Sequence, residues 1–118
     1  MSKLTDNFDS KELACPCCNN CVMDKEFMNN LQDIREECGF GFRINSGYRC
    51  KEHNSKVSKN SMGDHARGYA VDIACNNRYK RSLIVTCALL TNYFKDIAID
   101  KKFIHLGKGK TKQGIGVY

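Results

Sequence analysis

The residues of this sequence best suited to metal chemistry are two histidines and one aspartate: His65, Asp72 and His105. Asp72 stands in the middle of the apolar run 69–74, and His105 interrupts a second apolar run at 103–106. A buried carboxylate needs a cation or strong donors beside it. Two imidazoles and a carboxylate are a ligand set for Zn²⁺ that leaves a fourth position for water, which zinc makes nucleophilic near neutral pH. The prediction depends on the combination, because each residue alone is more typical of a structural role.

Small residues precede the aspartate. Gly68 and Ala70 stand four and two positions before Asp72. If 69–74 is a strand, Ala70 and Asp72 share one of its faces. We expect the two small residues to leave room beside Asp72 for an ion and a substrate.

Eight cysteines provide a second group of potential metal ligands, and four of them fall in one short stretch: Cys15, Cys17, Cys18 and Cys21. Thiolates at such spacing can surround a tetrahedral Zn²⁺, which would make this stretch a second, structural metal site. Cys50 and His53 could also approach it. The pattern C-x-C-C-x-x-C is not a standard two-knuckle spacing, so free thiols and disulfides formed after release from the cell stay open as alternatives.

Two long helices are predicted to support these groups. The first covers 24–38, capped by Asp24 and ended by Gly39, and the second begins at Asn77. Their apolar faces are predicted to consist of Phe27, Leu31, Ile34 and Cys38 in the first helix, and of Leu83, Cys87, Leu90 and Phe94 in the second. A capping box from Asp9 to Glu12 predicts a short helix at 10–14.

Short strands are predicted between and after the helices, at 42–45, 69–74, 97–99 and 103–106, with an edge strand at 115–118. The stretch 15–21 is predicted to be a loop, and so is the polar stretch 50–68, apart from a helical turn near His53. Helices and strands mix without a regular βαβ rhythm. This favours an α+β fold with a small antiparallel sheet and two main helices.

Composition narrows the class of protein further. The chain has 118 residues, 42% of them hydrophobic, and a formal net charge of +6. The share of hydrophobic residues is high enough to exclude a disordered chain. The length suits a single domain, 1–118. No apolar run reaches the ~18 residues of a membrane helix, and the first residues have no apolar core of a signal peptide.

The sequence resembles the M15-type zinc peptidases of peptidoglycan, which include D-Ala-D-Ala carboxypeptidases, VanX-like dipeptidases and many short phage endolysins. The resemblance lies in His65-x6-Asp72 with its small residues, in the late Ile104-His105, and in Ile44-Asn45-Ser46-Gly47-Tyr48-Arg49 followed by His53-Asn54. Phe8 and Cys15 resemble the start of the short phage-type members. The resemblance covers nearly the whole chain and implies the Hedgehog/DD-peptidase fold.

The resemblance implies specific roles for several residues. His65, Asp72 and His105 match the zinc ligands. Arg49 matches the arginine that binds substrate near the scissile carbonyl or its carboxylate, a task that suits its guanidinium fork. The family's usual serine before the first ligand is Gly63 here, and Ser61, slightly further away, is taken as substrate-binding.

The sequence departs from the family near the last ligand. Many members have an Asp, Glu or His two or three residues before it, which acts as general base, but here these positions are Phe103 and Lys102. Asp100 is the nearest carboxylate and the first candidate for the base, with Asp64 second. The usual Asp after the last His is also missing, since Leu106-Gly107 follows.

These observations predict a zinc metallopeptidase that hydrolyses peptidoglycan stem peptides, of the D-Ala-D-Ala carboxypeptidase or L-Ala-D-Glu endopeptidase type, and acts as a phage-type endolysin. One alternative is a zinc-containing binding module that has lost hydrolysis, as in the Hedgehog signalling domain. Another is a small zinc protein organised by the cysteines.

The expected partners and location follow from this reading. The lysines of the tail, Lys108, Lys110 and Lys112, and the positive charge suit anionic cell-wall polymers. No nucleic-acid motif or membrane segment is visible, and we expect a monomer. Without a signal peptide, the protein is expected to be made in the cytoplasm and to reach the wall after release during phage lysis or in a virion.

Overall fold

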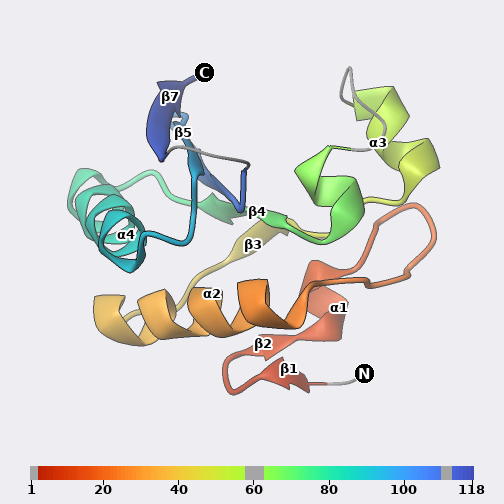
Figure 1. Cartoon of the computed structure of the whole chain (residues 1–118), viewed down its shortest axis with the longest axis horizontal. Helices are drawn as coiled ribbons and strands as arrows, with labels where there is room; N and C mark the ends of the chain where they lie inside the picture. The colour runs from red at the N-terminus through yellow and green to blue at the C-terminus, as the bar shows by residue number, and fades with distance from the viewer. Residues whose placement is uncertain (1–2, 58–62, 110–112) are drawn as a thin grey trace.

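Five short strands form one sheet in the order β3-β4-β6-β5-β7 (Figure 1). In a computed structural model that describes residues 3–57, 63–109 and 113–118, they are Ile44–Ser46 (β3), Ala70–Ala74 (β4), Asp96–Ile99 (β5), Phe103–Gly107 (β6) and Gly114–Val117 (β7). Neighbours from β3 to β5 pair antiparallel, as predicted, whereas β7 runs parallel to β5. The sheet is therefore mixed, and the predicted C-terminal edge strand is present.

Two long helices pack against each other beside this sheet: α2 (Lys25–Cys38) and α4 (Arg78–Thr91). Their predicted caps are confirmed. Asp24 Oδ2 accepts a hydrogen bond from the Phe27 amide at 2.9 Å, and Asn77 Oδ1 accepts one from the Lys80 amide at 2.9 Å. Gly39 ends α2 in the left-handed conformation with φ +76°, where a glycine has no steric cost. With α+β architecture and two main helices, the predicted fold class is confirmed.

The buried face of α4 differs from the predicted one. Ile84 and Ala88 are buried, whereas Leu90 is 80% exposed. Phe94 is buried, but it lies beyond the end of the helix at Thr91. Apolar residues occur almost all round this helix, so the sequence pattern does not single out one face, and a shift of one residue turns the face by about 100°.

The N-terminal region adds elements that the sequence pattern did not indicate. Lys3–Thr5 (β1) and Phe8–Asp9 (β2) form a small antiparallel sheet, and Ser10–Leu13 (α1) follows with the predicted capping box. In Figure 1, α2 lies between this hairpin and the main sheet, and β1 contacts α2. Buried Phe8 and Leu13 join the core formed by the sheet and the long helices.

The segment predicted as a long loop contains two helical pieces among its described residues. Lys51–Val57 forms α3, which confirms and extends the helical turn predicted near His53, and Asp64–Arg67 forms a 3₁₀ turn, η1, just before β4. Glu52 in the first turn and Lys56 in the last turn of α3 complement the helix dipole, a local signal that the polar composition of 50–68 obscured. Both pieces stand at the same end of β4 and carry residues of the site. Within the described residues, no helix is long and apolar enough to cross a membrane.

Candidate metal centre and active site

Asp72 and His105, two of the predicted metal ligands, lie opposite each other on neighbouring strands. The antiparallel register of β4 and β6 pairs Asp72 with His105, and on the other side of β4 Ser46 pairs with Asp72. Side chains of directly paired residues stand on the same face of a sheet. The register therefore places Ser46, Asp72 and His105 in one row, with Asp72 and His105 both buried.

His65 reaches the same place from η1. Its Nδ1 lies 2.7 Å from the carbonyl oxygen of Gly47, and because a carbonyl can only accept, Nδ1 carries the proton. Nε2 faces Asp72 and lies 3.5 Å from its Oδ1. This is the tautomer that a histidine needs to bind a metal through Nε2, with its other nitrogen held by a hydrogen bond.

His105 lies between two carboxylates. Its Nδ1 is 2.9 Å from Asp72 Oδ1, and its Nε2 is 3.3 Å from Asp96 Oδ2. Burial lowers the pKa of His105, but the hydrogen bonds to Asp72 and Asp96 raise it by more, to about 9. Burial raises the pKa of Asp72, but the hydrogen bonds from His105 and His65 bring it well below its usual range. The metal-free site thus pairs a carboxylate with a protonated imidazole.

The three predicted ligands fit a zinc ion. One nitrogen or oxygen of each of His65, Asp72 and His105 lies within 4.8 Å of the others. Ligands about 2.0–2.1 Å from a tetrahedral zinc stand roughly 3.3–3.4 Å apart. The separations of 3.5 Å from His65 Nε2 and 2.9 Å from His105 Nδ1 to Asp72 Oδ1 bracket that value. Two imidazoles and one carboxylate leave a coordination position for water, as catalytic zinc sites do.

Arg49 is held against this group by its neighbours. Its backbone N–H donates to the His65 carbonyl at 3.1 Å. Its guanidinium donates to Ser46 Oγ at 3.0 Å and to Asn54 Oδ1 at 3.3 Å, and its Nη2 lies 3.4 Å from Asp72 Oδ2. The structure therefore brings the predicted substrate-binding arginine next to the predicted ligands.

A cleft of about 420 Å³ opens over these residues. Besides the ligands and Arg49, its wall includes Phe103 and Tyr118, whose rings lie 5.2 Å apart between centroids. Burial raises the pKa of Tyr118, and the charges of Asp72 and Asp96 raise it further. The tyrosine hydroxyl is thus a neutral donor at the edge of an acidic group.

Asp100, the first candidate for the general base, is not brought to this cleft. It lies in the turn between β5 and β6, where its Oδ2 accepts a hydrogen bond from the Lys102 amide at 2.9 Å and its own amide donates to the Phe103 carbonyl. Among the described residues, it borders a separate hollow with Arg81 and Lys101. The turn bends the chain back after β5, but it does not direct the Asp100 carboxylate to the cleft. The carboxylate is instead held by the backbone amide of Lys102 in the same turn.

The second candidate does line the cleft. Asp64 belongs to η1, and its Oδ2 accepts a hydrogen bond from the Gly109 amide at 3.1 Å. Ser61, predicted to bind substrate, lies outside the described residues, as do Lys110 and Lys112.

Sequence reasoning missed Asp96, which the structure places against His105. Asp96 is the first residue of β5 and pairs with Gly107 of β6. A Cβ on Gly107 would lie 3.2 Å from His105 Nε2 and 3.5 Å from Asp96 Cβ. The Asp96 carboxylate therefore reaches His105 from the neighbouring strand. Gly107, which pairs with Asp96, has no side chain that would stand between the two groups. The signal available in the sequence was an aspartate at the start of a short apolar segment.

The structure requires glycine at position 68 for a different reason from the one expected. It has φ +77°, and a Cβ there would collide with the carbonyl oxygen of Val22. The Gly68 carbonyl accepts a hydrogen bond from the Asp24 amide at 3.0 Å. The absence of a side chain thus lets the loop before β4 pack on the chain leading into α2, rather than making room beside Asp72.

The cysteines also gather, but not in the predicted combination. Cys15 and Cys17 lie near Cys50, and the three sulfur atoms are within 4.8 Å of one another. Cys21, which was expected in the group, is not part of it. All eight cysteines are free thiols.

Comparison with known proteins assigns the chain to a family. A search of curated proteins finds no match. A family model described as Peptidase M15 matches residues 6–107, a stretch that includes all three ligands of the candidate metal centre together with Arg49, Asp64 and Asp96. The chain therefore belongs to the Peptidase M15 family.

Proposed function

We propose that the protein is a zinc-dependent peptidase that cleaves peptide bonds in peptidoglycan stem peptides and serves as a phage-type endolysin. Membership of the Peptidase M15 family supports a hydrolase of the metallopeptidase class. The observation that carries the proposal is the convergence of His65, Asp72 and His105 at one end of a cleft, at separations that suit zinc. The bond cut is of the D-Ala-D-Ala or the L-Ala-D-Glu type.

The ligand atoms of the proposed zinc are His65 Nε2, Asp72 Oδ1 and His105 Nδ1. When bound, zinc polarises a carbonyl and lowers the pKa of a water molecule toward neutrality. His65 is held for this by the Gly47 carbonyl, and His105 by the Asp96 carboxylate. Because both rings are hydrogen-bonded on their far nitrogens, the protein fixes their orientation before the metal arrives.

Arg49 is proposed to bind the peptide. Its guanidinium is anchored by Ser46 and Asn54, which leaves a fixed positive charge facing the cleft beside Asp72. A guanidinium in this position pairs with the carboxylate of a stem peptide or stabilises negative charge on the scissile carbonyl. Both types of stem-peptide bond offer such a group.

Asp64 is the carboxylate we propose as proton acceptor. The acidic residues among the described lining of the cleft are Asp64, Asp72 and Asp96. Asp72 is assigned to the metal, and Asp96 accepts a hydrogen bond from His105. Asp64 remains, and its hydrogen bond from the Gly109 amide holds it at the same wall. A carboxylate there would take a proton from water and pass it to the leaving amine.

The setting of the reaction is also proposed. A formal net charge of +6 would draw the protein to anionic wall polymers, with the enzyme made in the cytoplasm and reaching the wall when the cell is lysed or from a virion. We also propose that the protein acts as a monomer.

The test is digestion of purified peptidoglycan and of defined muropeptides, with mass spectrometry of the new amino termini. We expect cleavage that is abolished by a chelator and restored by zinc. His65→Ala should remove the activity, and Asp64→Asn should lower kcat by about 10²-fold or more while zinc stays bound. The proposal is wrong if zinc-loaded protein cleaves no type of stem peptide.

A binding module that keeps zinc but has lost hydrolysis is the second candidate. The missing carboxylate just before His105 favours it, since the nearest one upstream in the sequence, Asp100, is held in the β5–β6 turn. In that case zinc-loaded protein would bind a stem peptide with measurable affinity, Arg49→Ala would weaken the binding, and no new amino terminus would appear.

A further inference from the structure

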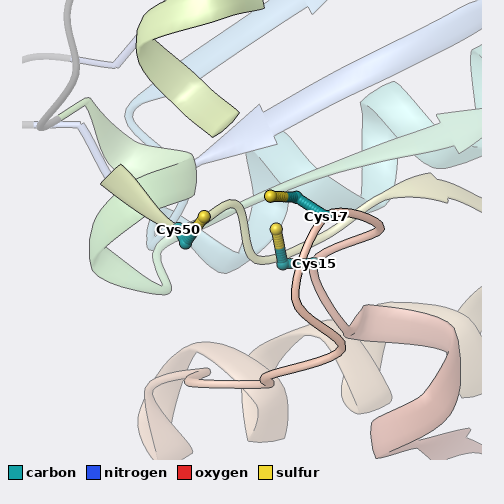
Figure 2. A group of neighbouring side chains, drawn as sticks. All are labelled: Cys15, Cys17 and Cys50. Atoms are coloured by element: carbon teal, nitrogen blue, oxygen red, sulfur yellow. The ribbon is translucent and has the colours of Figure 1, made fainter. Parts of the chain in front are cut away.

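Thiols from two distant parts of the chain converge away from the cleft. Figure 2 shows the side chains of Cys15 and Cys17, on the loop after α1, gathered near Cys50, which directly precedes α3. The sulfur atoms of these three residues lie within 4.8 Å of one another. Cys15 is buried and Cys50 partly buried, while Cys17 is exposed. None of these residues lines the cleft.

A fourth thiol belongs to the same neighbourhood. A backbone hydrogen bond at Asn20 lowers the pKa of Cys18, but burial and the thiols of Cys15 and Cys50 raise it by more. Cys18 directly follows Cys17 on the same loop and is exposed, but its sulfur is not among the three that lie within 4.8 Å of one another. For Cys21, in contrast, burial alone raises the pKa, and no other cysteine contributes.

The backbone around Cys15 favours its thiolate. Burial raises the pKa of this thiol, but backbone N–H groups of Cys50, Cys17 and Cys18 act in the opposite direction. Together with the Cys50 thiol they bring the pKa of Cys15 down to about 7. Thiolate is the form of cysteine that binds metals.

We propose that Cys15, Cys17, Cys18 and Cys50 bind a second, structural zinc ion. Sulfur atoms at about 2.3 Å from a tetrahedral zinc stand roughly 3.8 Å apart, so the three nearest sulfurs need to close by at most about 1 Å. Binding releases the remaining thiol protons to solvent, which leaves four thiolates around the metal. A complete set of sulfur ligands closes the site to water, as in structural zinc sites, and suits zinc rather than magnesium or calcium.

This ion would brace the segment that serves the catalytic group. Residues 47–50 run alongside Leu13: the Tyr48 amide donates to the Leu13 carbonyl at 2.8 Å. A Cβ on Gly47 would lie 2.8 Å from Leu13 Cα, so the two backbones are in close contact. The same short segment holds His65 through the Gly47 carbonyl and carries Arg49. Zinc joining Cys15 to Cys50 would fasten both ends of this contact.

Metal analysis of the reduced protein tests the proposal. We expect two zinc ions per chain in the wild type, one in Cys17→Ser and one in His65→Ala, with none in the double variant. Cys17 is exposed, so its replacement leaves the fold intact, and circular dichroism of each variant verifies this. Loss of one ligand should weaken zinc binding by more than about 100-fold, since even residues that only support a ligand cost 10–100-fold.

Cys21→Ser is the matched control, because Cys21 lies in the same loop and was expected in the group. It should keep both ions, whereas Cys18→Ser should lose one. If Cys21→Ser loses an ion and Cys18→Ser does not, the proposed ligand set is overturned. Cobalt in place of zinc in the His65→Ala protein gives a second readout: sulfur-to-cobalt charge-transfer bands should appear, and their absence from the folded protein overturns the site.

The metal count separates this proposal from the proposed function. One ion in the wild type that is lost in His65→Ala but kept in Cys17→Ser would refute the thiolate site and leave the catalytic zinc standing. One ion that is lost in Cys17→Ser but kept in His65→Ala would refute the catalytic zinc and leave the thiolate site. Neither result depends on measuring peptidase activity.

Discussion

Asp72 Oδ1 lies 2.9 Å from His105 Nδ1, across two strands that pair these residues directly. The same carboxylate lies 3.5 Å from His65 Nε2 and 3.4 Å from Arg49 Nη2. Asp72 thus contacts both predicted zinc-binding imidazoles and the predicted substrate-binding guanidinium. In the proposed enzyme, this one buried side chain would couple metal binding to substrate binding.

Asp72→Asn should abolish zinc binding at this site together with peptidase activity. The amide keeps the shape but loses the charge that faces three cationic or metal-binding partners. Removing one member of a buried ion pair costs about 3–5 kcal/mol, so the metal-free variant should also unfold at lower denaturant concentration. Asp100→Asn is the control: its amide oxygen can still accept from the Lys102 N–H, so stability should change by less than about 1 kcal/mol, with unchanged zinc content and turnover. A large fall in turnover for Asp100→Asn would restore it as the base.

Asp96→Asn should weaken zinc binding without removing any ligand. The Asp96 carboxylate accepts from His105 Nε2, which fixes the ring so that Nδ1 faces Asp72. Loss of such support costs roughly 10–100-fold in metal affinity. Competition with a chromogenic chelator measures the affinity, and Asp96→Glu should recover part of it. An unchanged zinc affinity for Asp96→Asn would show that the 3.3 Å contact does not position the ligand.

Arg49→Lys should lower kcat/KM by about 10²-fold or more while zinc content stays the same. Lysine keeps the charge but cannot donate at once to Ser46, Asn54 and the cleft, as the guanidinium fork does. Loss of one donor to developing charge costs about 10²–10³-fold in rate. Steady-state kinetics on a defined muropeptide separates kcat from KM. Full activity of the lysine variant would mean that charge alone suffices.

Gly68→Ala should destabilise the protein far more than Gly39→Ala. Both glycines have positive φ, +77° and +76°, so each alanine pays about 1–2 kcal/mol for a left-handed backbone. A Cβ at position 39 meets nothing within 4 Å, whereas at position 68 it collides with the Val22 carbonyl. Urea unfolding of the two variants isolates the collision as the difference between them. Equal losses would show that the loop before β4 shifts freely away from Val22.

His105 should make the stability of the metal-free protein depend on pH. Its folded pKa of about 9 exceeds the ordinary value near 6.5, so the protonated ring stabilises the fold fully below 6.5, and this contribution fades as the pH rises to 9. At about 1.36 kcal/mol per pKa unit, the total is on the order of 3 kcal/mol. We expect the stability difference between wild type and His105→Gln, both in chelator, to shrink over this range. A constant difference would contradict the pairing of a protonated His105 with Asp72.

Much of the fold could be predicted because its signals are local. Asp24, Asn77 and Gly39 each cap a helix through atoms within a few residues, so their types and positions suffice. Asp72 and His105 were identified as polar residues that interrupt apolar strands. That pattern is informative because burial of such groups demands partners.

Other features depend on how distant segments meet, which local pattern does not reveal. Asp96 acquires its contact with His105 only through the pairing of β5 with β6. Cys50 replaces Cys21 in the thiol group because residues 47–50 run against Leu13, although Cys21 is nearer in sequence. Asp100 is the nearest carboxylate before His105 in the sequence, but a hydrogen bond from the amide of Lys102 in its own turn decides where its carboxylate lies.

The two groups of potential ligands occupy separate and successive stretches of the chain. The thiols lie between residues 15 and 50, whereas the His–Asp–His group extends from 65 to 105 and needs β4 to pair with β6, with α4 and β5 intervening. During synthesis, the proposed sulfur ligands therefore leave the ribosome before the last proposed ligand of the catalytic zinc has been made. A ribosome-bound chain could be braced by metal while it is still unable to cut a peptide, so hydrolytic competence would arrive last.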